Sequence, residues 1–128
     1  MDILQTLKRM LGVPSVQQTV LAATSTPSDG APESETSGVS CRGIGKVDLT
    51  FTFSAAAETA TVRLWLMDGD DNWQHYVTDK EVSAAAGQTR VCIDPFDTGS
   101  FNRIAVELIT APTTGTLRVQ TSPKAPSE

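Results

Sequence analysis

The fold of this chain is decided by two neighbouring segments, Lys46-Val-Asp-Leu-Thr-Phe-Thr-Phe53 and Ala60-Thr-Val-Arg-Leu-Trp-Leu-Met67. In the first segment every second residue is apolar, a period of two that is typical of a strand with one buried face. In the second, Val62, Leu64 and Leu66 again take alternate positions. The two segments therefore predict two half-buried strands.

The same alternation continues beyond these segments. Turn-forming residues at 68–72 and 84–87 separate the strands, and Pro95 places a loop at 94–100 because proline cannot donate to a strand ladder. Six short strands, with a seventh expected within residues 16–23, predict an all-β, antiparallel β-sandwich. The expected strands after the first two cover residues 73–77, 89–93, 104–108 and 117–119.

The N-terminal segment has a different pattern. A short amphipathic helix is expected over residues 2–11, because its apolar residues recur at helical spacing and Gly12 and Pro14 end it. Ten residues are too few for a stable isolated helix, so the stripe must be covered by a partner. The stripe comprises Ile3, Leu4, Leu7, Met10 and Leu11.

A polar stretch rich in serine, proline and glycine separates this helix from the strands, and its composition is that of a flexible linker. It could reach a neighbouring subunit or pack back on its own core. The expected organisation is an anchoring arm at 1–23, a linker at 24–40, a β-sandwich domain at 41–121 and a polar tail at 122–128.

Composition excludes several classes of function. A net charge of −5 argues against nucleic-acid binding, which requires a basic face. No apolar run approaches the roughly 20 residues that span a membrane. The N-terminus does not have the pattern of a secretory signal, because Lys8 and Arg9 interrupt its apolar residues. Synthesis in a reducing cytoplasm is therefore expected, and Cys41 and Cys92 are expected to be thiols rather than a disulfide.

The candidate binding residues are few. The turn with Asp68, Asp70 and Asn72 resembles half of a calcium loop, but Trp73 stands where the sharp-turn glycine belongs, so a solvated hairpin turn is the preferred interpretation and no metal is expected. Aromatic side chains near Arg63 offer a second candidate, a flat surface for a sugar ring. The residues of this candidate surface are Arg63, Trp65, Trp73 and Tyr76.

No catalytic constellation is evident. The sole histidine, His75, has no assignable nucleophile and is expected to be a partly buried structural residue that shares a strand face with Trp73 and Val77. The acidic residues lie mostly in turns and in the linker, where paired-carboxylate chemistry is not expected. The sequence predicts a protein that is not an enzyme and uses no cofactor.

The strand block resembles a module of tailed-bacteriophage virion proteins. The resemblance covers residues 46–120 and rests on the threonine-rich first strand, on the second strand with its Asp-Gly hairpin ending at Trp73, and on the strand Arg103-Ile-Ala-Val-Glu-Leu-Ile109 followed by a glycine-containing hairpin. The resemblance implies a jelly-roll-like sandwich displayed on a capsid. It transfers no functional residues.

The sequence thus predicts a capsid cement or decoration protein on the outer surface of the virion. Its partners would be the major capsid protein and neighbouring copies of itself, and a homotrimer would suit a threefold capsid position. Two alternatives stay open at this stage. One is a glycan- or surface-binding sandwich module, and the other is a tail or neck accessory protein of the virion.

Overall fold

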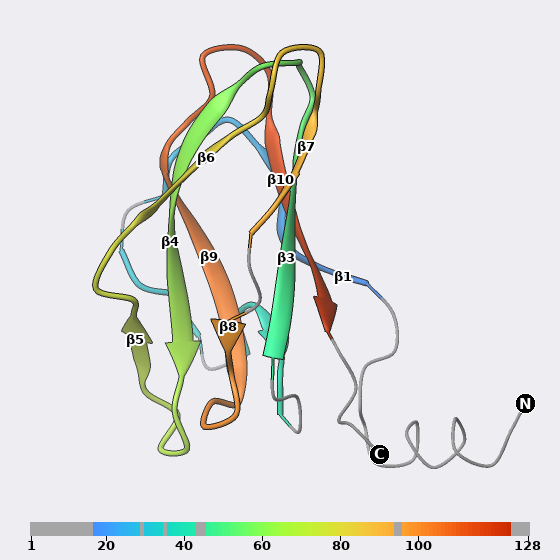
Figure 1. The fold of residues 1–128 in the computed structure, drawn as a ribbon. Helices are drawn as coiled ribbons and strands as arrows, with labels where there is room; N and C mark the ends of the chain where they lie inside the picture. Colours follow the sequence, from blue (N-terminus) through green and yellow to red (C-terminus); the bar gives the residue numbers. More distant parts are fainter. Residues whose placement is uncertain (1–16, 29, 35, 43–45, 94–95, 124–128) are drawn as a thin grey trace, which may run out of the picture.

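A computed structural model describes residues 17–28, 30–34, 36–42, 46–93 and 96–123. These residues form two antiparallel sheets packed face to face, and the chain passes repeatedly from one sheet to the other (Figure 1). No helix of the described ranges is long and apolar enough to cross a membrane. The expected all-β sandwich of two antiparallel sheets is confirmed.

Sheet A is built around the first of the two segments that decide the fold. Its strand order is β1–β10–β3–β7, and β8 also pairs with β3. In the register of this sheet Phe51 lies opposite both Val119 and Val91, so apolar residues of three strands share one face. The strands of sheet A are β1 (Gln18–Thr24), β3 (Lys46–Phe53), β7 (Arg90–Cys92), β8 (Phe96–Asp97) and β10 (Leu117–Pro123).

Sheet B is built around the second segment. Its order is β2–β9–β4–β5, and β6 pairs with the first half of β4. The central pair, β4 and β9, runs in register from Val62 opposite Leu108 to Met67 opposite Arg103. The strands of sheet B are β2 (Val39–Ser40), β4 (Thr59–Met67), β5 (Trp73–His75), β6 (Lys80–Ser83) and β9 (Arg103–Thr110).

The core lies between the sheets and contains the alternating apolar residues of both. Leu49 and Phe51 from sheet A and Val62 and Leu108 from sheet B have no solvent exposure. Alternation sends their neighbours to the outer faces. Burial of one face of each sheet is the main stabilising contribution, because apolar surface is removed from water there.

The structure differs from the predicted strands at three places. Strand β6 was not expected, because Val82 is its only buried apolar residue. Strand β5 ends at His75, so Val77 does not extend it and is 95% exposed. The loop predicted at 94–100 contains the two-residue strand β8.

The predicted boundaries at the N-terminal side also need correction. The strand expected within 16–23 is present as β1. Both β1 and β2 precede residue 41, so the described chain already takes part in sheet pairing from Gln18 onward. The expected helix at 2–11 and its apolar stripe lie outside the described residues. At the other end β10 continues to Pro123, two residues into the predicted polar tail.

Candidate functional site

A polar segment covers the outer face of sheet B. We call residues 28–38 the strap, of which 29 and 35 are not described. The amide of Ser28 donates to the carbonyl of Leu108 at 3.0 Å, and the indole Nε1 of Trp73 donates to the carbonyl of Ser34 at 3.0 Å. The strap continues into β2, which pairs with β9. The segment predicted to be a flexible linker is therefore bonded along the sandwich over most of its length.

Beneath the strap lies a second buried layer, on the side of sheet B that faces away from the core. Trp65 and Glu107 are 8% and 5% exposed. One carboxylate oxygen of Glu107 accepts from the Nε1 of Trp65 at 2.9 Å, and the other accepts from the amide of Gly30 at 2.9 Å. Glu107 thus joins the strap to the sheet. A carboxylate that accepts two such bonds is satisfied despite its burial.

The outer face continues toward β6 as a charged patch. The guanidinium of Arg63 donates to both carboxylate oxygens of Asp79, at 2.8 and 3.0 Å. This hydrogen bond from Arg63 is the main reason why the pKa of Asp79 lies below its usual value. The same bond is the main cause of a raised pKa of Arg63. Arg63 is therefore already engaged within the chain.

The aromatic residues predicted to form a binding surface do not lie on one face. Trp65 points away from the core as expected, but the strap covers it. Trp73 is half-buried and uses its indole N–H on the strap. Tyr76 packs against the core cluster between the sheets. The expected flat platform of Trp65, Trp73 and Tyr76 is not formed.

His75 contacts Trp65 but is not buried. The two rings meet edge to face, with centroids 5.0 Å apart. The Nδ1 of His75 donates to the carbonyl of Tyr76 at 2.7 Å. The prediction of a partly buried histidine was wrong, because strand β5 is short and lies at the sheet edge, where the ring stays exposed.

The acidic turn is a hairpin between β4 and β5. The Oδ1 of Asp68 accepts from the amides of Asp70 and Asn72 at 2.9 and 3.1 Å, so this carboxylate closes the turn. Asp71 has a left-handed φ of 63°. No group of three or more histidine, cysteine or acidic side chains in the described part of the chain is arranged to hold a metal ion.

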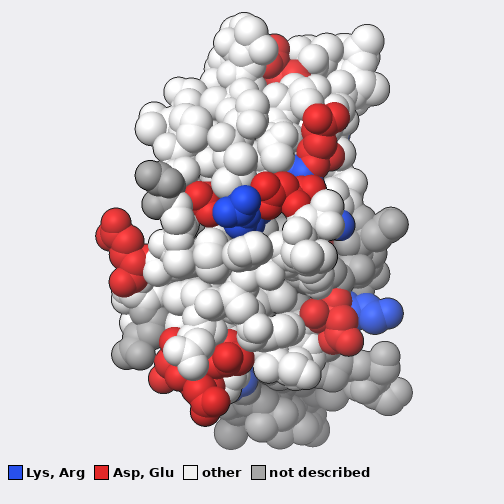
Figure 2. Space-filling model, turned by 90° about the vertical axis from the view of Figure 1, so that its left-hand side faces the viewer, with Lys and Arg blue, Asp and Glu red and all other residues white. Residues whose placement is uncertain are grey.

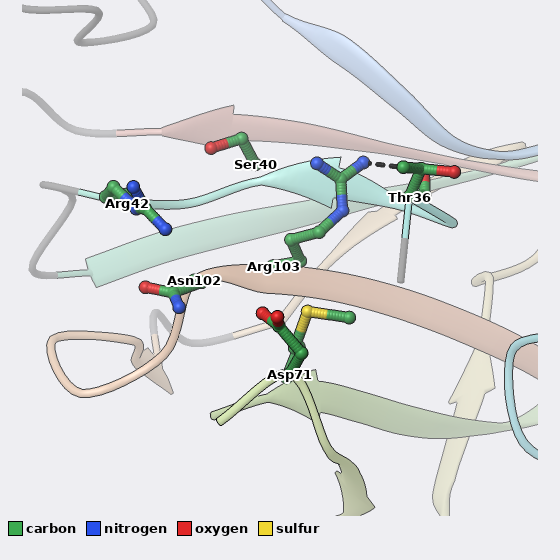
Figure 3. Close-up of a pocket in the computed structure, with 7 residues that line it drawn as sticks. Thr36, Ser40, Arg42, Asp71, Asn102 and Arg103 are labelled. Atoms are coloured by element: carbon green, nitrogen blue, oxygen red, sulfur yellow. Dashed lines mark hydrogen bonds between the residues drawn. The ribbon is translucent and has the colours of Figure 1, made fainter. Parts of the chain in front are cut away.

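A pocket opens where the strap, the hairpin turn and the start of β9 meet (Figure 3). Its volume is about 360 Å³. Arg42 and Arg103 line one part of it, and Asp71 and Asn102 line another. The lining also contains Thr36, Ser40 and Met67. This pocket was not predicted, because its residues come from three stretches that are separate in the sequence, 36–42, 67–71 and 102–103.

The two cysteines are free thiols in different surroundings. Cys41 is 1% exposed, and burial raises the pKa of its thiol to about 11. Cys92 is exposed at the end of β7, beside Thr50. The structure thus places one thiol in the core and the other on the outer face of sheet A.

On the side of the molecule where β5 and β6 lie, acidic side chains outnumber basic ones, although most of that surface is uncharged (Figure 2). This distribution agrees with the net charge of −5.

Comparison with known protein families, curated proteins and solved structures finds no significant match to this chain.

Proposed function

We propose that this chain is a non-enzymatic structural protein of a virus particle, a cement or decoration protein on the outer surface of a tailed-phage capsid. The proposal includes a jelly-roll-like arrangement of the strands and an N-terminal helix at 2–11 that binds a neighbouring subunit. The observation that supports it most is the position of β1. This strand lies at the edge of sheet A, and its first residue, Gln18, pairs with Thr121 near the end of β10.

The position of β1 decides how an arm can act. Because β1 is bonded to the sandwich, the chain that precedes it leaves from the edge of sheet A. Seventeen residues precede Gln18, and at about 3.3 Å per residue they would span at most about 55 Å. The reach of the proposed arm therefore comes from these residues and not from the strap.

The apolar stripe provides the contact. Each of its five side chains would contribute about 1.5–3 kcal/mol if fully buried against a neighbour, before the cost of ordering the segment. Such a contact is modest for one copy. Symmetric repetition on a capsid raises the total strength of attachment without any new contact.

The charge of the molecule supports an outer position. A chain with a net charge of −5 is repelled by packaged nucleic acid. The side on which acidic groups outnumber basic ones (Figure 2) would face solvent on a capsid. The partners would be the major capsid protein and neighbouring copies of this chain, and a trimer would suit a threefold position.

The test compares particles assembled with different forms of the chain. Quantitative mass spectrometry of purified heads and tails should find the full-length chain on heads at a fixed copy number. A chain that lacks residues 1–16 keeps β1 and should fold, but it should be absent from heads. Equal recovery of both forms on heads would contradict the arm mechanism. Recovery on tails would contradict the capsid position and favour the tail or neck alternative.

A matched pair of double variants tests whether attachment requires the apolar stripe or is lost whenever negative charge is added to the segment. Leu7→Glu combined with Leu11→Glu places two charges in the stripe, whereas Gln5→Glu combined with Thr6→Glu places two charges outside it. We expect only the first pair to abolish attachment to heads. Equal loss with both pairs would contradict apolar docking.

A further inference from the structure

The pocket at the end of the strap carries an inference beyond the proposed function. Its volume of about 360 Å³ corresponds to roughly a dozen water molecules at about 30 Å³ each. The space therefore accommodates a small organic molecule and not only a single ion. Figure 3 shows that Arg42, Asn102 and Asp71 approach it from three different segments.

Arg103 is held rigidly at this pocket. Its Nε donates to the carbonyl of Ser37 at 2.8 Å, and its Nη2 donates to the carbonyls of Thr36 and Gly38 at 2.8 and 3.0 Å. A guanidinium has five N–H donors, so three are used and the two on Nη1 have no acceptor within the described residues. The orientation of the cation is fixed before any ligand arrives, which lowers the entropic cost of binding.

Arg42 supplies a second positive charge. It lies two residues after the end of β2 and is exposed. Its side chain has no hydrogen-bond or ion-pair partner in the ranges that the structure describes. Two guanidinium groups that line one pocket are suited to a planar carboxylate, because each can donate to its oxygens. The amide of Asn102 also lines the pocket, and its Nδ2 donates to the carbonyl of Asp68 at 3.3 Å. That bond fixes its orientation.

Asp71 gives the pocket a negative side. Its backbone has a φ of 63°, and its amide donates to the carbonyl of Asp68 at 3.2 Å, which fixes the residue in the hairpin turn. Its carboxylate has no donor among the described residues. A dianion such as phosphate would be disfavoured by this carboxylate, whereas a ligand with a cationic group would be favoured.

We infer that this pocket binds a free amino acid, with the ligand carboxylate at Arg42 and Arg103 and the ligand ammonium at Asp71. Two cations and one anion line the same cavity, and one of the cations, Arg103, is held by three backbone carbonyls. Met67 in the lining provides apolar contact for a side chain. The inference is independent of attachment to a capsid, and either could fail without the other.

The test uses the full-length chain and three matched probes. L-leucine carries both charged groups, 4-methylpentanoate lacks the ammonium, and 3-methylbutylamine lacks the carboxylate. Backbone amide NMR shifts of Asp71, Asn102 and Arg103 are followed up to about 20 mM of each probe, which saturates a site of millimolar affinity. We expect leucine to bind at least about tenfold more tightly than either analogue, because each loses one charge-assisted contact.

Two variants assign the charges. Arg42→Gln should weaken leucine binding about tenfold or more, whereas Arg90→Gln, an equal change of charge at an exposed position on sheet A, should leave it unchanged. Asp71→Asn keeps a residue type that tolerates positive φ. It should weaken leucine about tenfold without weakening 4-methylpentanoate.

Three results would overturn the inference. The first is the absence of shifts at the pocket with leucine. The second is equal binding of leucine and 4-methylpentanoate, which would show that Asp71 does not contribute to binding of the ligand ammonium. The third is tighter binding of inorganic phosphate than of leucine, which would show a site for anions in general.

Discussion

Among the described residues, the outer face of sheet A is partly exposed, whereas the outer face of sheet B carries a second layer of chain. On sheet A, Thr50, Thr52 and Gln120 point away from the core and are partly exposed. On sheet B, Trp65 and Glu107 occupy equivalent outward positions and are 8% and 5% exposed. The strap, which covers the outer face of sheet B, accounts for this difference between the described residues of the two faces.

This difference shows what alternation in a sequence can and cannot indicate. A period of two identifies which side chains leave the core. It does not indicate whether another segment covers them. Trp65 on β4 and Glu107 on β9 are buried because the polar strap lies over them. The amide of Gly30 in the strap and the indole N–H of Trp65 both donate to the Glu107 carboxylate.

The largest contrast concerns the two thiols. In the native chain Cys92 should react with a thiol reagent as an ordinary exposed cysteine, and Cys41 should react at least about 100-fold more slowly. A pKa of about 11 instead of 9.0 alone reduces the thiolate fraction about 100-fold, and burial excludes the reagent as well. Labelling with mass detection measures both rates. Similar rates would contradict the placement of Cys41 in the core.

Next in size is the loss of the carboxylate that joins the strap to sheet B. Glu107→Ala leaves the indole N–H of Trp65 and the amide of Gly30 without acceptors, so the free energy of unfolding should fall by about 2–4 kcal/mol. Glu107→Gln keeps one acceptor oxygen and should cost less. Thr52→Ala, on the open face of sheet A, should change stability by no more than about 0.5 kcal/mol. Urea unfolding measures the stability of all three variants. Equal losses of unfolding free energy in Glu107→Ala and Thr52→Ala would contradict the claim that the outer face of sheet B is a buried layer and that of sheet A is not.

A smaller effect is expected where the strap passes closest to β9. Gly38 has a φ of 69°, and a Cβ at this position would collide with the carbonyl oxygen of Ile104. Gly38→Ala should therefore destabilise the fold by about 1–3 kcal/mol. Gly69→Ala, where no atom lies within 4 Å of the added Cβ, is the matched control and should cost no more than about 0.5 kcal/mol. A neutral Gly38→Ala would mean that the strap does not lie against β9.

The smallest effect is the pH dependence of the Arg63–Asp79 pair. The pKa of Asp79 is lowered in the folded state, chiefly by the hydrogen bond from Arg63, so its contribution to stability is present above the ordinary aspartate pKa of about 4. That contribution is lost as the pH falls through the lowered value. Asp79→Asn should remove this part of the acid dependence when unfolding is measured between about pH 2 and 6. An unchanged acid profile would contradict the pairing.

The sequence was sufficient for the elements whose own side chains determine them. Strands β3, β4 and β9 alternate strongly, and the turn at Asp68 contains residues that form turns through their side chains. Strand β6 was missed because it has a single buried apolar residue and is held mainly by its pairing with β4. A strand of this kind depends on its neighbour rather than on its own pattern.

The candidate sites were harder to predict for the same reason. The roles of Glu107 and Arg103 arise from contacts with residues more than 40 positions away along the chain. Composition alone classified the strap as a linker, because serine, proline and glycine are typical of linkers. The only signal in its favour is Gly38, which is required where the backbone approaches β9, and one glycine in a glycine-containing segment is not distinctive.

Amide hydrogen exchange on the full-length chain tests most directly whether the strap is a fixed layer of the fold. The amides of Ser28 and Gly30, which donate to Leu108 and Glu107, should exchange far more slowly than those of an unstructured peptide. In Glu107→Ala the protection of Gly30 should be lost while β9 remains protected. Exchange of Ser28 and Gly30 at the unstructured rate, with β9 protected in the same sample, would contradict the second layer on sheet B.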